Sequence, residues 1–164
     1  MSTNETAATE RPGLPEIPKS LRPFAVVVGM AAVMWVLEII DTIPHTNLDR
    51  WGIQPRTLRG LPGILFAPFL HTGFPHLIGN TIPFIVLGSI IALSGTQRFL
   101  QVTVIIGLAS GLAVWLIGPA HSYTVGASSL VFGYVTYLVA RGFFERKILY
   151  LVGGLIVAFV YGTV

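Results

Sequence analysis

Five long stretches of almost uninterrupted apolar residues run through this chain and limit what it can fold into. They cover residues 24–43, 77–93, 99–117, 124–140 and 148–164. Each is close to the roughly 20 residues that a helix needs to cross the hydrocarbon core of a bilayer. Backbone N–H and C=O groups find no water partner in lipid, so such stretches must form helices, in which these groups bond to one another. The pattern therefore predicts an all-α membrane protein that crosses the bilayer several times.

The composition also indicates that lipid is the surrounding solvent. Hydrophobic residues make up 53% of the 164-residue chain and charged residues only 10%, whereas an average soluble domain has roughly 25% charged residues. The net charge of +3 lies in short clusters rather than on one basic face, which argues against nucleic-acid binding. No cysteine is present, so disulfide and thiol chemistry are excluded.

Charge also predicts how the chain is oriented. Residues 1–22 are polar and read as a disordered tail, which leaves 23–164 as the transmembrane domain. Lys and Arg are in excess on the side of the N-terminus, at positions 11, 19, 22, 98, 141, 146 and 147, against positions 50, 56 and 59 on the other side. Because positive residues stay in the cytoplasm, we expect a cytoplasmic N-terminus in the plasma (inner) membrane.

One group of informative residues is polar and lies at membrane depth, where placing a polar side chain costs free energy. The string HTGFPHLIGN places His71 just before the second apolar stretch, with His76 and Asn80 four residues apart on one helix face. Two imidazoles and an amide without a nearby carboxylate or thiolate form a poor zinc site, so we predict no metal. Hydrogen bonding between helices or an interfacial position is the alternative interpretation of these residues.

A second string, GASS, opens the fourth apolar stretch. A serine at the start of a helix is most often a cap or a packing residue. Ser128, however, follows Gly126, where backbone can approach a substrate closely. Backbone N–H groups at a helix start also point at any oxyanion formed near the serine. Both features suit a nucleophile.

The order of the spans brings the two strings to the same depth. The second and fourth helices both start at the outer surface and run inward. We therefore expect His76, Asn80 and Ser128 to lie within about two turns of the outer ends of these helices. A third pattern, Glu38 and Asp41 on one face of the first helix, resembles a paired-carboxylate site, but its interfacial position favours a structural role. His121 lies in a short outer loop and is expected to be solvated.

The two strings together resemble the motifs of the rhomboid family of intramembrane serine proteases. In that family the second helix carries H-x-x-x-x-H-x-x-x-N, and the fourth carries G-x-S-G with an aromatic residue four positions after the serine. The matching residues are HTGFPHLIGN at 71–80 and GASSLVFGY at 126–134. The resemblance covers about residues 24–164. It implies a rhomboid-like helical bundle with five of the usual six transmembrane helices present.

The resemblance assigns roles to individual residues. Ser128 would be the nucleophile, while His76, Asn80 and the Ser128 backbone N–H would form the oxyanion hole. Gly126 would permit close approach of the substrate, which would be the transmembrane segment of another membrane protein in the bilayer. No cofactor is implied.

Three supporting roles follow from the same resemblance. Phe132 would occupy the position whose aromatic ring packs against the catalytic histidine, where tyrosine is usual. His71 would support the first loop and the route of water to the site. The fifth span would be the mobile helix beside which substrate enters.

The sequence departs from the family pattern in two places. Ser129 stands where glycine is usual, and its hydroxymethyl group would widen a tight helix crossing. The family's catalytic base is a histidine on a sixth helix, and no such segment occurs before Val164. A serine hydroxyl without a base is barely nucleophilic at neutral pH.

Three interpretations follow from this missing base. We expect the chain to be a C-terminally incomplete rhomboid serine endopeptidase that is inactive in this form. The alternative is a short, non-catalytic rhomboid-like protein that binds membrane clients. A small transporter is a third class, but it would need a polar pathway through the bundle, and the sequence has only one polar cluster.

Overall fold

Helices dominate the part of the chain that the computed structural model describes, which is residues 17–44, 46–146 and 148–162. The long helices are α1 (Arg22–Asp41), α3 (Phe74–Ala92), α4 (Thr96–Ile117), α5 (Ser128–Glu145) and α6 (Ile148–Gly162). Between α1 and α3 lie the short elements η1 (Leu48–Trp51), η2 (Leu58–Gly60), α2 (Gly63–Phe66) and η3 (Ala67–Phe69). The all-α prediction is confirmed. Most of the predicted tail, residues 1–16, lies outside the described residues.

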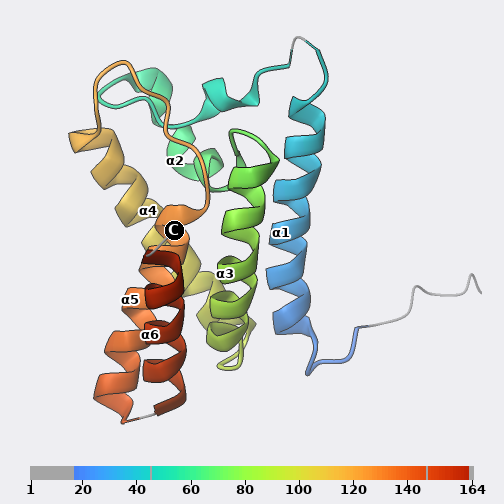
Figure 1. Cartoon of the computed structure of the whole chain (residues 1–164), viewed down its shortest axis with the longest axis vertical. Helices are drawn as coiled ribbons and strands as arrows, with labels where there is room; N and C mark the ends of the chain where they lie inside the picture. The colour runs from blue at the N-terminus through green and yellow to red at the C-terminus, as the bar shows by residue number, and fades with distance from the viewer. Residues whose placement is uncertain (1–16, 45, 147, 163–164) are drawn as a thin grey trace, which may run out of the picture.

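The five long helices correspond to the five predicted spans. Three of them, α1, α3 and α4, are long and apolar enough to cross a bilayer, while α5 has 18 residues and α6 has 15. The start of α5 differs from the prediction, which began the fourth span at residue 124. Gly126 has a φ of +109° and Ala127 is the N-cap, so the helix begins only at Ser128. Figure 1 shows that α5 consequently starts below the level at which α3 starts.

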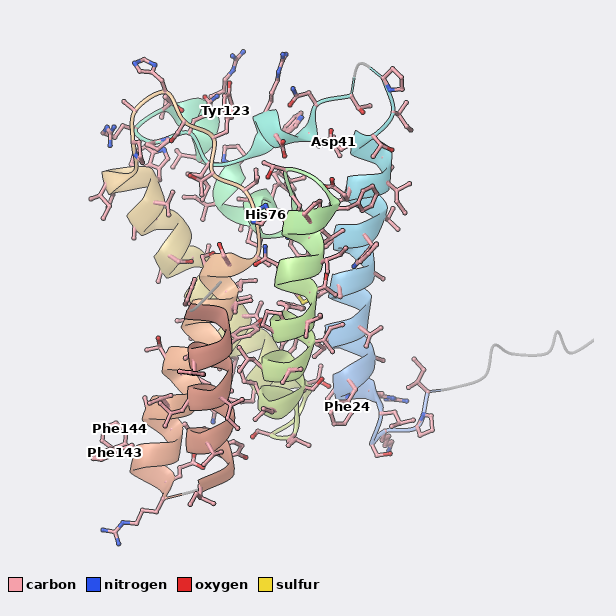
Figure 2. The ribbon with its side chains drawn as sticks, viewed as in Figure 1. Phe24, Asp41, His76, Tyr123, Phe143 and Phe144 are labelled. Atoms are coloured by element: carbon pink, nitrogen blue, oxygen red, sulfur yellow. The ribbon has the colours of Figure 1, made fainter. Side chains whose placement is uncertain are left out.

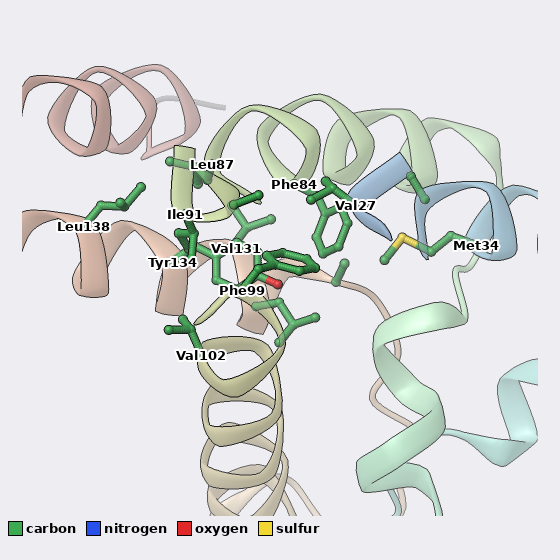
Figure 3. Close-up of a cluster of buried hydrophobic side chains, with 14 of the residues drawn as sticks. Val27, Met34, Phe84, Leu87, Ile91, Phe99, Val102, Val131, Tyr134 and Leu138 are labelled. Carbon is green, nitrogen blue, oxygen red and sulfur yellow. The ribbon is translucent and has the colours of Figure 1, made fainter. Parts of the chain in front are cut away.

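The core forms where α3 packs against its neighbours α1, α4, α5 and α6. Phe84 of α3, Phe99 of α4 and Tyr134 of α5 are fully buried and in ring contact (Figure 3). The Tyr134 hydroxyl lies 2.6 Å from the Thr103 hydroxyl, so the one polar atom of this aromatic cluster is hydrogen-bonded inside the bundle. Burial of these rings fixes α3, α4 and α5 relative to one another.

Two loops cover the same end of the bundle, shown at the top of Figure 1. The first loop is residues 42–73, and the second loop is residues 118–127. Ile53 and Thr124 join them by a pair of backbone hydrogen bonds of 2.9 and 3.0 Å. The Arg56 guanidinium donates to the Leu116 and Gly118 carbonyl oxygens, which places a cation at the C-terminal end of the α4 dipole. The two loops are therefore tied together by backbone and side-chain hydrogen bonds.

The other end of the bundle is tied by Arg141 of α5. Its guanidinium donates to the Ser94 hydroxyl in the turn after α3 and to the Glu145 carboxylate one turn along α5. The same guanidinium lies 4.5 Å from the centre of the Tyr150 ring on α6. Higher along α6, Gly154 packs directly on Val135 and Val139 of α5. Arg141 thus joins α3, α5 and α6 at one point.

Candidate functional site

The first turns of α3 carry two of the predicted site residues. The helix begins after Gly73, whose φ of +121° is a backbone conformation that favours glycine. One turn separates His76, which is half-buried, from Asn80, which is 1% exposed. The Asn80 side-chain amide donates to the His76 carbonyl oxygen at 3.1 Å. The backbone of α3 therefore holds the two side chains on one face, as their spacing predicts.

The second loop brings Gly126 against these two side chains. It descends from the loop-covered end of the bundle towards α5 and passes close to His76 (Figure 2). A Cβ atom built on Gly126 would lie 2.6 Å from His76 Cε1, 2.8 Å from His76 Nε2 and 3.6 Å from Asn80 Nδ2. The Gly126 N–H donates to the Ala67 carbonyl oxygen at 2.8 Å, which fixes the loop to η3. Only a residue without a side chain fits here.

Ser128 is the first residue of α5 and follows Gly126 by two positions. It is half-buried, as is Ser129 beside it. Val131 is the first residue here whose N–H bonds to a carbonyl of the preceding turn, that of Ala127. The N–H groups of the first residues of α5 therefore point out of the helix start, where they attract negative charge.

The two nitrogens of His76 have different surroundings. Nδ1 lies 3.2 Å from the Thr72 hydroxyl, whereas the Nε2 edge faces Gly126. When the hydroxyl donates to Nδ1, the proton of the neutral ring is on Nε2. This tautomer places an N–H donor next to the Gly126 backbone. The sequence analysis did not identify Thr72, although it lies four residues before His76, at the spacing of side chains that meet on a helix.

His71 is buried rather than interfacial, with 2% of its surface exposed. Its ring centre lies 5.2 Å from that of His76. Burial, together with the positive charge that His76 can carry, lowers the pKa of His71 to about 4. The nearby Phe69 backbone offsets this lowering only in part. His71 is therefore neutral at pH 7 and fills the space between the first loop and the start of α3.

Three carboxylates lie on the α1 side of this site. Asp41 accepts a 2.6 Å hydrogen bond from the Leu48 N–H, which ties the end of α1 to the first loop. Burial raises the pKa of Asp49 in η1, Asp41 raises it further, and His76 lowers it. The third is Glu38 of α1, which is 5% exposed. The described residues contain no group of three or more His, Cys, Asp or Glu side chains placed to hold a metal ion.

A polar cavity of about 350 Å³ lies between the two loops. Its lining includes Asn47, Asp49, Arg50, Thr72 and Tyr123. Thr72 connects this cavity to His76 through the hydroxyl contact described above. The cavity gives the candidate site a polar approach from the loop-covered end of the bundle.

The remaining predicted residues lie apart from this cluster. Phe132 is 52% exposed on α5, and Tyr134 is the aromatic residue of that helix that is buried in the core. His121 is exposed, as expected, and adopts a φ of 62°. His45 lies outside the described residues. Phe132 therefore presents its ring on the surface of the described bundle.

Comparison with known proteins places this arrangement in a family. A sequence model of the rhomboid domain matches residues 59–164, a range that includes His76, Asn80, Gly126 and Ser128. The chain belongs to the rhomboid family. This rhomboid is an integral membrane protein, and its family match starts in the first loop, within η2.

Relatives of this rhomboid occur in mycobacteria. It is 41% identical to uncharacterized proteins of Mycobacterium tuberculosis and Mycobacterium bovis, over 97% of this chain and 70% of each relative. An uncharacterized protein of Mycobacterium leprae is 38% identical over 84% of this chain and 57% of its own length. The similarity therefore extends over nearly all of this rhomboid, including α1.

Proposed function

We propose that this rhomboid belongs to an intramembrane serine endopeptidase that cleaves peptide bonds in or near the transmembrane segments of other membrane proteins. The observation that carries the proposal is the contact of Gly126, two residues before Ser128, with the side chains of His76 and Asn80. A serine at a helix start, next to a glycine that leaves room for a substrate backbone and two side-chain donors, supplies the nucleophile and the oxyanion donors of acyl transfer, which also requires a base.

In the proposed reaction the Ser128 hydroxyl oxygen attacks the scissile carbonyl carbon. Negative charge develops on the carbonyl oxygen, and His76 Nε2–H, the Asn80 amide and the Ser128 N–H stabilise it. Collapse of the intermediate breaks the peptide C–N bond and leaves an acyl-enzyme, which water then hydrolyses.

The proton released by Ser128 requires a base. By the family pattern we propose a histidine on a sixth helix, which takes this proton and returns it to the leaving amine. Phe132, exposed on α5, is proposed to face that histidine, and His71 to support the site from below the first loop. We further propose that the protein lies in the plasma membrane with residues 1–22 in the cytoplasm. Cleavage then takes place at the outer side.

A serine-reactive fluorophosphonate tests this proposal. The protein made from the complete reading frame should be labelled at Ser128 and lose labelling in Ser128→Ala. Ser129→Ala is the matched control, because Ser129 is equally half-buried one residue further along the same helix. Equal labelling of the wild type and Ser128→Ala would refute the nucleophile assignment.

A further inference from the structure

An apolar groove of about 790 Å³ lies between α1 and the first loop. On α1 its lining follows one stripe, which consists of Val26, Gly29, Met30, Val33 and Leu37. These positions recur every three or four residues, so they lie on a single face of the helix. The opposite wall is built by η1, α2 and η3 of the first loop. None of the lining residues takes part in the reaction proposed above.

The groove is open along both walls. A Cβ atom built on Gly29 would have no described atom within 4 Å. Val33 on α1 is exposed, and so are Leu65 and Phe66 on the opposite wall. Exposed apolar surface of this extent is usually covered by a partner. Because α1 is long and apolar enough to cross the bilayer, the molecules that reach this surface are those of the membrane.

The length of the groove indicates which membrane molecule fits it. From Val26 to Leu37 the axis of α1 rises roughly 16 Å. This is about half of the roughly 30 Å thickness of the hydrocarbon core, so the groove is as long as one leaflet is deep. A partner helix about 10–12 Å across would need roughly 1,300 Å³ over the same length, which is more than the groove contains. An acyl chain from one leaflet is the better match.

The η1 end of the groove joins an apolar surface to a cation. Trp51 of η1 lines the groove and makes an edge-on contact with Phe66, with 6.4 Å between the ring centres. Tryptophan is typical of the interface between membrane and water. Arg50, the preceding residue, is exposed and lines the polar cavity between the two loops. It makes no hydrogen bond or ion pair with another described residue. Its guanidinium is therefore available to an anion at the mouth of the groove.

We propose that the groove binds one phospholipid from the leaflet on the loop side, with an acyl chain along the α1 stripe and its phosphate on Arg50. The surrounding lipid is as apolar as the groove, so the chain alone gives little preference for this place. Selection comes from the guanidinium, whose planar fork of donors matches the oxygens of a phosphate. The bound lipid joins the first loop to α1. This site does not depend on the proposed protease activity.

Two substitutions separate the roles of the groove and the cation. Gly29→Leu fills the open space beside α1, and leucine is also a better helix former than glycine. Its matched control is Ala32→Leu, which enlarges an exposed residue of the same helix outside the groove. Arg50→Gln removes the cation. Arg59→Gln is its control, because Arg59 is an exposed arginine in η2 of the same loop.

Native mass spectrometry in detergent, with dioleoyl phosphatidylglycerol as the probe, counts the bound lipid. The wild type, Ala32→Leu and Arg59→Gln should each retain one lipid with the same Kd. Gly29→Leu should not retain it, and Arg50→Gln should bind it about tenfold more weakly, the usual effect of losing a charge-assisted hydrogen bond. Dioleoylglycerol has the same chains and no phosphate. The wild type should bind it about tenfold more weakly than the phospholipid, and Arg50→Gln should bind both probes equally.

Thermal unfolding in the same detergent provides a second measurement. The phospholipid should raise the Tm of the wild type, Ala32→Leu and Arg59→Gln, because a ligand of the folded state stabilises it. The Tm of Gly29→Leu should not respond, while its value without lipid shows that the variant is folded. Retention of the lipid by Gly29→Leu would overturn the inference, and so would equal affinity of the wild type for the two probes. A wild-type dimer that Gly29→Leu dissociates would instead assign the groove to a second copy of the chain and refute the lipid site.

Discussion

The backbone of Gly126 lies so close to the imidazole of His76 that an added Cβ would sit 2.6 Å from the ring. The two residues belong to different segments, the second loop and α3, and their contact positions the start of α5 against the donors of α3. The contact therefore links Ser128 to His76 and Asn80 more directly than any other feature of the site.

Gly126→Ala should disrupt the site, and Gly95→Ala supplies the matched control. Both glycines have a left-handed φ, +109° and +100°, but nothing lies within 4 Å of a Cβ on Gly95. Backbone strain alone costs about 1 kcal/mol in each variant. Overpacking against His76 adds about 1–3 kcal/mol in Gly126→Ala alone. Thermal unfolding in detergent measures the difference, and only Gly126→Ala should also lose probe labelling; equal losses in both variants would contradict this account.

Thr72 should determine which nitrogen of His76 carries the proton. In the wild type the Thr72 hydroxyl lies 3.2 Å from Nδ1, and we expect it to donate to this nitrogen and leave the ring proton on Nε2. Thr72→Val keeps the shape but removes the hydroxyl, and ¹⁵N chemical shifts of the imidazole should then show more of the Nδ1–H tautomer. Thr72→Ser restores the hydroxyl and should restore the wild-type spectrum. An identical His76 spectrum in all three proteins would show that Thr72 does not set the tautomer.

His71 should make the protein less stable in acid. Its folded-state pKa of about 4 lies below the ordinary histidine value of 6.5, so the unfolded chain binds more protons between these two values. Protonation of His71 therefore leaves the unfolding free energy unchanged above about pH 6.5. As the pH falls towards 4, it lowers the unfolding free energy by at most about 3 kcal/mol. His71→Gln should flatten the dependence of unfolding free energy on pH within this window. A slope equal to that of the wild type would rule out His71 as its source.

Arg141→Ala should loosen α6. The substitution removes hydrogen bonds to Ser94 and Glu145 together with the cation–π contact to Tyr150. We expect a loss of about 1–3 kcal/mol in unfolding free energy and faster hydrogen exchange in residues 148–156. Arg98→Ala is the control, because Arg98 is exposed near the same end of the bundle. Equal effects of the two substitutions would show that the Arg141 contacts do not hold α6.

The apolar stretches predicted the long helices well, because the length of an apolar run depends only on consecutive residues and not on tertiary contacts. The start of α5 was misplaced because Val125 is apolar yet belongs to the second loop, whose path depends on a glycine conformation and on the bridge between Ile53 and Thr124. The short helices of the first loop were not predicted either. Their apolar residues between positions 58 and 69 merge with the following span and carry no clear period.

Local spacing also predicted which residues would share a face in the site. The four-residue step from His76 to Asn80 follows from helix geometry alone. In contrast, the hydrogen bond between Thr103 and Tyr134 joins two different helices, and the burial of His71 depends on how the first loop folds around it. Such contacts exist only in the assembled bundle, so no pattern along the chain could reveal them. The roles of all the assigned site residues stay predictions: Ser128, His76, Asn80, Gly126, Phe132 and His71.

The position of the polar cavity at one end of the bundle has a consequence for the direction of the proposed reaction. The polar cavity above His76 opens between the two loops, while the far ends of α3 and α5 meet through buried Leu87, Ile91 and Leu138. The polar approach to His76 therefore lies on the loop side, whereas hydrocarbon side chains fill the opposite end of these two helices. On the proposed function, hydrolysis is vectorial: the enzyme releases the part of its substrate that projects from the loop side and leaves the remainder embedded.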